Sequence, residues 1–176
     1  MHAETFGQEE ETKQKIRVKA ISLSLVLGIL ILLLKTIAYF ITGSRALQSD
    51  ALESVINVLA ALLALGAIIF AGRPADKNHP YGHGKMEFFA AAFEGGLISV
   101  ASIVIFHEAF VGFTKGVHIE SLNTGLILNA SGGILNGFLG WHLIRTGKKV
   151  SSKALEADGY HIMSDFYTTI GIFGGL

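Results

Sequence analysis

Two stretches of the chain repeat one pattern of polar residues. Residues 46–57 read ALQSDALESVIN, and residues 154–165, 108 positions later, read ALEADGYHIMSD. Each copy places polar side chains at offsets 0, 3 and 7, which share one face of an α-helix. They are Asp50, Glu53 and Asn57 in the first copy, and Asp158, His161 and Asp165 in the second. Two such faces turned toward each other would offer a divalent metal ion oxygen and nitrogen ligands.

Both copies open apolar runs that are long enough to cross a bilayer. An ionisable group at membrane depth is expensive, so it is expected to face a partner or a water-filled cavity. We therefore predict one intramembrane metal site, formed by Glu53, Asn57, His161 and Asp165. Asp50 and Asp158 lie near the expected helix starts, where capping or snorkelling explains them as well as metal binding does. Asp50 is thus an accessory metal ligand only if metal binding, rather than capping or snorkelling, explains its position.

A second group of candidate ligands lies in a proline-containing segment. Residues 72–85 hold both prolines of the chain, which predicts a loop between two helices. Asp76, His79 and His83 follow one another there at intervals of three and four residues. Such residues form either a metal site on the aqueous side of the membrane or a merely solvated turn.

The composition indicates a membrane protein. Of the 176 residues, 51% are hydrophobic and only 16% are charged. Basic and acidic residues number 14 each, so no basic excess suggests nucleic acid. The absence of cysteine excludes disulfides and thiolate metal ligands. The polar N-terminus precedes an apolar run that is too long for a signal-peptide core, so we expect no cleaved signal.

Five apolar runs predict an all-α, polytopic membrane helix bundle. They cover about residues 18–41, 46–71, 86–113, 123–144 and 154–176. We expect residues 1–17 to form a solvated, disordered tail and residues 18–176 to form the transmembrane domain. Glu87 and Glu94 in the third run are expected to face a neighbouring helix or a dimer mate. Eleven Lys and Arg residues lie on the side of the N-terminus and two on the other, which places the N-terminus and the loop in the cytoplasm.

These features together resemble the cation diffusion facilitator family of divalent-metal efflux transporters. The resemblance rests on residues 44–51, on residues 74–87 and on the spacing of His161 and Asp165. Members have six transmembrane helices and usually a cytoplasmic C-terminal domain, and they work as homodimers that exchange metal for protons. The resemblance implies that this chain holds five of the six helices, without the sixth helix or the C-terminal domain.

The resemblance also implies roles for the candidate ligands. It assigns the transport site to Glu53, Asn57, His161 and Asp165, and a second zinc site to Asp76, His79 and His83. Asn57 departs from the pattern, since zinc transporters of the family more often have Asp there. Zinc is the first expectation for the transported ion, and iron, manganese and cobalt are the alternatives. Protons compete with metal for the same ligands, and His161 is the natural coupling group.

Two other functions stay open. His79 and His83 resemble one histidine box of membrane di-iron enzymes, but no second box occurs among the seven histidines, so an enzyme is not expected. A chain that stops inside an apolar helix is also consistent with a non-transporting partner of a longer family member. The main expectation is a multi-pass homodimer of the plasma (inner) membrane that exports divalent metal ions.

Overall fold

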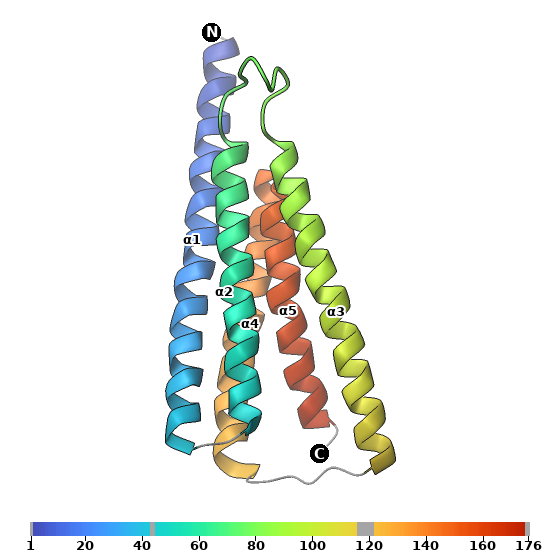
Figure 1. Cartoon of the computed structure of the whole chain (residues 1–176). Helices are drawn as coiled ribbons and strands as arrows, with labels where there is room; N and C mark the ends of the chain where they lie inside the picture. The colour runs from blue at the N-terminus through green and yellow to red at the C-terminus, as the bar shows by residue number, and fades with distance from the viewer. Residues whose placement is uncertain (1, 43–44, 116–121, 175–176) are drawn as a thin grey trace.

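The computed structural model describes residues 2–42, 45–115 and 122–174. These residues form five helices and the loops that join the second helix to the third and the fourth to the fifth. The helices are α1 (His2–Thr42), α2 (Arg45–Ala71), α3 (Lys85–Lys115), α4 (Leu122–Val150) and α5 (Lys153–Gly174). Figure 1 shows them side by side in an elongated bundle, with the α2–α3 loop at the end where α1 begins. We call this the loop end, after residues 72–84. The predicted all-α helix bundle is confirmed.

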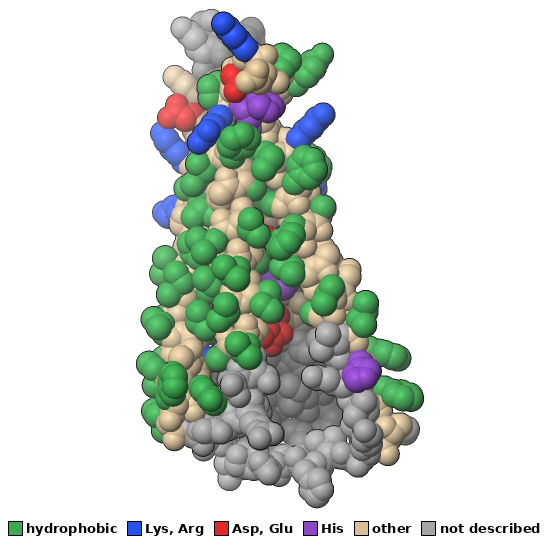
Figure 2. Space-filling view, viewed as in Figure 1, with side chains coloured by type: hydrophobic (Ala, Val, Ile, Leu, Met, Phe, Trp, Pro, Cys, Tyr) green, Lys and Arg blue, Asp and Glu red, His purple; other side chains and the backbone are tan. Residues whose placement is uncertain are grey.

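The exterior of the bundle is apolar, as a membrane requires. Among the described residues, three helical segments are long and apolar enough to cross a bilayer: Gly7–Ile41, Ala51–Ala71 and Lys85–Ile103. Large apolar side chains such as Phe40 and Phe106 point outward. Figure 2 shows hydrophobic side chains over most of the visible face and Lys and Arg mainly toward the loop end. The predicted fourth span falls within α4, and α5 covers the described part of the predicted fifth span.

The N-terminal residues differ from the expected disordered tail, because α1 is helical from His2 onward. Nζ of Lys13 lies 2.7 Å from a carboxylate oxygen of Glu9, one helical turn away. Nε2 of Gln14 donates a hydrogen bond of 2.7 Å to the carbonyl oxygen of Ile68. The carbonyl oxygen of Ile68 also accepts from the N–H of Gly72 at 3.1 Å, so the second contact ties α1 to the last turn of α2. The polar segment is therefore part of the bundle.

Close backbone packing holds α4 against α5. These two helices share the most extensive contact in the described bundle. A Cβ atom added to Gly140 would lie 2.8 Å from the carbonyl oxygen of Gly159, and one added to Gly159 would lie 2.8 Å from the backbone nitrogen of Ile144. Small residues permit such an approach between membrane helices. This packing fixes the position of α5 and of the polar face that it carries.

Helix α4 continues beyond the predicted fourth span, whereas α5 begins within one residue of the predicted fifth span. The basic residues 145–149 are helical, and α4 ends at Val150. The N–H of Ser152 donates to the carbonyl oxygen of Gly147 at 2.9 Å, which closes α4. Oγ of Ser152 then accepts from the N–H of Leu155 at 3.4 Å and caps α5. Ser151 between them has a φ of 55° and turns the chain.

Candidate metal centre

Three of the four predicted intramembrane ligands meet between α2 and α5. Nε2 of His161 lies 3.0 Å from Oδ1 of Asn57. Nδ2 of Asn57 donates a hydrogen bond of 2.6 Å to Oδ2 of Asp165. His161 is buried and the other two residues are half-buried. Asn57 thus bridges the two ligands of α5, and we call the three residues the α2–α5 cluster.

The directions of these hydrogen bonds set the proton positions. An ionised Asp165 can only accept hydrogen bonds, so the NH₂ group of Asn57 faces it and the amide oxygen faces His161. Nε2 of a neutral His161 therefore carries the ring proton. Nδ1 is buried and has no hydrogen-bond partner among the described atoms. Because a metal ion needs a bare ring nitrogen, binding at Nε2 requires the ring proton to move to Nδ1, which gives the other tautomer of the neutral ring.

Glu53, the fourth predicted ligand, takes no part in these two hydrogen bonds. It lies one turn nearer the start of α2, and its side chain is exposed. Its role as a ligand stays a prediction. The side chain of Asp50 lies outside the described residues, so its accessory role also stays a prediction.

The structure excludes capping and snorkelling as explanations of Asp158. It is the sixth residue of α5 rather than a cap, and it is 1% exposed, so it does not snorkel. Its Oδ2 accepts a hydrogen bond of 2.8 Å from Oγ of Ser24 on α1. Glu94 of α3, also 1% exposed, faces the interior, as expected for a glutamate at membrane depth.

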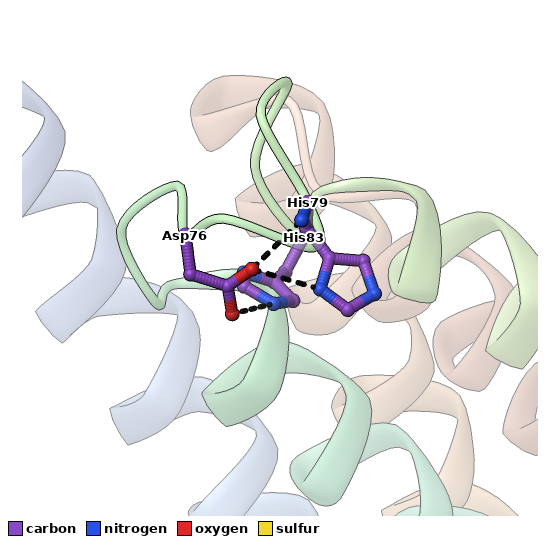
Figure 3. A group of neighbouring side chains, drawn as sticks. All are labelled: Asp76, His79 and His83. Carbon is purple, nitrogen blue, oxygen red and sulfur yellow. Dashed lines mark hydrogen bonds and ion pairs between the residues drawn. The ribbon is translucent and has the colours of Figure 1, made fainter.

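The predicted loop cluster is formed by Asp76, His79 and His83 (Figure 3). One ligand atom from each lies within 4.8 Å of the others, and no other group of His, Cys, Asp and Glu side chains in the described ranges meets this condition. The carboxylate of Asp76 reaches both rings: Oδ1 is 3.2 Å from Nδ1 of His79, and Oδ2 is 3.4 Å from Nε2 of His83. Two nitrogens and a carboxylate suit a borderline divalent ion such as zinc.

The loop backbone holds the Asp76 carboxylate in place. Oδ1 accepts hydrogen bonds from the backbone N–H of His79 at 2.7 Å and of Asn78 at 2.9 Å. These bonds, foremost that from His79, hold the pKa of Asp76 below its ordinary value. Gly82, with a φ of 79°, lets the chain turn back. His83 is thereby buried edge-on against Phe70, with ring centroids 4.6 Å apart.

A buried polar network at the loop end was not predicted. The guanidinium of Arg17 donates to the carbonyl oxygen of Val150 at 2.6 Å and lies 3.7 Å from a carboxylate oxygen of Glu87. Oγ of Ser152 donates to the other oxygen of Glu87 at 2.5 Å. Of these residues, the sequence pointed only to Glu87, as an acidic residue expected to face a neighbouring helix or a dimer mate. Its partners come from α1 and from the α4–α5 turn, which local periodicity does not reveal.

Comparison with known proteins gives the family. The model of the cation efflux transmembrane domain matches residues 21–176. An uncharacterised transporter of Synechocystis sp. is 41% identical over 139 residues, which are 79% of this chain and 45% of that protein. The manganese efflux system protein MneP of Bacillus subtilis is 28% identical over 167 residues, 93% of this chain and 55% of that protein.

The metal cation efflux system protein CzcD of Cupriavidus metallidurans is 29% identical over 157 residues, 89% of this chain and 49% of that protein. The chain therefore spans about half the length of the curated relatives that it matches. The family match covers α2 to α5, the part of α1 from residue 21 onward, the α2–α5 cluster and the loop cluster. The chain belongs to the cation efflux family, the cation diffusion facilitators.

Proposed function

We propose that this chain is the membrane part of a divalent metal cation efflux transporter that exchanges metal for protons. The observation that carries the proposal is the α2–α5 cluster, which gathers an imidazole, a carboxylate and an amide inside an apolar bundle. Polar groups at membrane depth mark ion pathways when they converge on one another. No lipid-facing role explains three such groups in mutual contact.

The proposed transport site consists of Asn57, His161 and Asp165, with Glu53 as the fourth ligand and Asp50 as an accessory one. Four ligands of this kind suit tetrahedral zinc, whereas added water or Asp50 suits manganese, iron or cobalt. One relative is named as a manganese efflux protein, and a neutral Asn57 in place of a carboxylate favours a choice other than zinc alone. The metal is the transported substrate here.

Proton exchange follows from the state of the same ligands. When a neutral His161 binds metal at Nε2, its ring proton moves to Nδ1 and no net proton is released. The proton that competes with metal is the second one, which makes the ring an imidazolium with both nitrogens protonated. Another proton competes for Asp165 at low pH. Metal and protons are therefore alternative occupants of one site, which is the basis of an antiport cycle.

The loop cluster is proposed as a second cation site on the cytoplasmic side. Asp76, His79 and His83 lie at the loop end, which the distribution of Lys and Arg places in the cytoplasm. A site there would hold a metal ion outside the membrane-spanning part of the bundle. The homodimer and the plasma-membrane location belong to the same proposal and are supported by the family resemblance.

Metal binding to the purified chain in lipid nanodiscs tests the proposal. Titration calorimetry with Zn²⁺, Mn²⁺, Co²⁺ and Fe²⁺ should show two sites, of which Asp165→Ala removes one and Asp76→Ala the other. Glu156→Ala is the matched control, because Glu156 lies on α5 in an ion pair of 2.8 Å with Lys153. In proteoliposomes, metal uptake should drive proton counterflow, and Asp165→Ala should abolish both. Unchanged binding and flux in Asp165→Ala would contradict the proposed site.

A further inference from the structure

The centre of the bundle contains two carboxylates that the metal cluster does not use. Glu94 of α3 and Asp158 of α5 are each 1% exposed. Ser24 donates to one oxygen of Asp158. The other oxygen of Asp158 and both oxygens of Glu94 have no hydrogen-bond partner among the described atoms. We call these two residues the central carboxylate pair.

The helices α3 and α5 that carry the two carboxylates pack against each other, and burial leaves three of the four carboxylate oxygens without a hydrogen bond to any described atom. None of the ion pairs among the described residues includes either of them. Two neighbouring ionised carboxylates, buried without a cation, are far less stable than a pair that shares a proton. The pair therefore requires a bound cation of some kind.

The groups around the pair do not supply this cation. His161 lies one turn from Asp158 on α5, and its Nε2 already contacts Asn57. Of the cations of α1, Arg17 binds Val150 and Glu87. Lys19 is exposed, and Lys35 lies three turns from Ser24 toward the other end. Glu87, two turns from Glu94 on α3, is acidic and held by Ser152. The helix α2, which packs against α3 and α5, contributes buried alanines at 60, 61 and 64.

The number of oxygen ligands around the pair suits a proton better than a metal ion. Hard divalent cations take about six to eight oxygen ligands, or keep several waters. The pair offers two carboxylates and one hydroxyl that is already engaged. Along the same face of α5, Asp158 lies next to the buried, apolar Leu155 and Ile162 and to His161, whose Nε2 is engaged with Asn57. A proton needs a single oxygen and no further ligands.

We propose that Glu94 and Asp158 form a proton-binding site that holds at least one proton at neutral pH, separate from the metal ligands. It lies one helical turn from His161, on the side of the loop end. The binding of this proton stands without the proposed function. The role of this proton in metal exchange rests on the proposed function. A divalent ion at the α2–α5 cluster favours ionised carboxylates nearby, so the pair releases its proton when metal binds. By reciprocity, protonation of the pair weakens metal binding.

Infrared difference spectroscopy of the chain in nanodiscs tests the site directly. The wild type should show the carbonyl stretch of a protonated carboxylic acid at neutral pH. Glu94→Gln or Asp158→Asn should remove or shift this band, and each amide has nearly the size of the protonated acid, so the fold should persist. Glu156→Gln, at a half-buried residue of α5 that pairs with Lys153, should leave the band unchanged.

The pH dependence of unfolding supplies a second measurement. A carboxyl group protonated in the folded protein and ionised in the unfolded chain makes folding less favourable as pH rises. The unfolding constant of the wild type should thus gain about tenfold per pH unit for that proton, from the unfolded-state pKa of about 4.3 up to the pH at which the pair ionises. In Glu94→Gln this slope should be lost, and in Glu156→Gln it should persist.

Two outcomes would overturn the proton site. One is the absence of any band and of any pH slope that depends on Glu94 or Asp158. The other is calorimetry in which Glu94→Gln removes a Zn²⁺ or Mn²⁺ site that the wild type has, since that would make the pair a metal site. Loss of metal binding by the α2–α5 cluster would instead count against the proposed function and leave the band untouched.

Discussion

Nδ2 of Asn57 and Oδ2 of Asp165 lie 2.6 Å apart, although 108 residues separate them in the chain. The contact joins an amide donor to a carboxylate, so the α2–α5 cluster is held together without a metal ion. A carboxylate at position 57 would instead face Asp165 with a like charge. Asn57 therefore sets the balance between the metal-free and the metal-bound protein.

We expect Asn57→Asp to destabilise the metal-free chain and to strengthen metal binding. Repulsion with Asp165 and the lost hydrogen bond should lower the free energy of unfolding by about 1–3 kcal/mol. An added charged ligand should tighten Zn²⁺ binding at least about tenfold, or about 1.4 kcal/mol. Thermal unfolding with and without Zn²⁺ measures both effects, because a ligand that binds only the folded state raises Tm.

Asn136→Asp is the control for this variant. Asn136 is a buried asparagine of α4 outside the cluster, so the change should destabilise the chain without rescue by Zn²⁺. If Zn²⁺ stabilises Asn57→Asp no more than the wild type, Asn57 does not lie in a metal site.

The faces of the helices could be predicted from the sequence, because offsets of three, four and seven residues follow directly from helix geometry. That rule put His161 and Asp165 on one face of α5, and the structure shows both in contact with Asn57 of α2. The rule could not show whether Glu53 reaches the cluster. Periodicity tells which way a side chain points around its own helix, but it does not give the distance to the neighbouring helix. The loop cluster was predictable because its three residues are local in sequence and one turn orders them.

Contacts between helices that are distant in sequence were not predictable from spacing. The bond from Ser24 to Asp158 spans 134 residues, and nothing near either residue indicates that α1 and α5 are neighbours. Similarly, Arg17 reaches the end of α4 because the expected tail is helical and points along the bundle. These contacts depend on helix order and packing, which Gly140 and Gly159 help to set.

Gly140→Ala should destabilise the bundle. The new Cβ would lie 2.8 Å from the carbonyl oxygen of Gly159, a backbone atom that cannot move away without shifting α5. Overpacking of this kind costs about 1–3 kcal/mol. Unfolding by denaturant in detergent micelles would measure the loss, and weakened metal binding should accompany it because α5 carries His161 and Asp165.

Gly66→Ala should stabilise the bundle, in contrast to Gly140→Ala. Gly66 lies in α2, and an added Cβ meets nothing within 4 Å. Alanine should stabilise the helix there by about 0.5–1 kcal/mol. Equal effects of the two substitutions would show that α4 and α5 do not pack through Gly140.

Ser152→Ala should weaken the junction at the loop end. The hydroxyl caps α5 through the N–H of Leu155 and donates to buried Glu87. Loss of the cap and an unsatisfied carboxylate oxygen should together cost about 2 kcal/mol of unfolding free energy. Ser151→Gly is the matched neighbour: Ser151 is exposed and has a φ of 55°, so glycine should be neutral or stabilising. If Ser152→Ala leaves the free energy of unfolding unchanged, this network does not stabilise the junction of α3, α4 and α5.

The Asp76 carboxyl should titrate below its ordinary pKa of 3.8, chiefly because the backbone N–H of His79 donates to it. A lowered pKa in the folded loop means that the carboxylate stabilises the loop above the ordinary pKa and that this contribution is lost as pH falls through the lowered value. Carbon NMR of the Asp76 carboxyl in the metal-free chain would give the midpoint. His79→Gln keeps the backbone N–H, so the pKa should stay low although the imidazole is gone. A return to 3.8 in that variant would show that the ring, rather than the backbone of the loop, holds the carboxylate ionised.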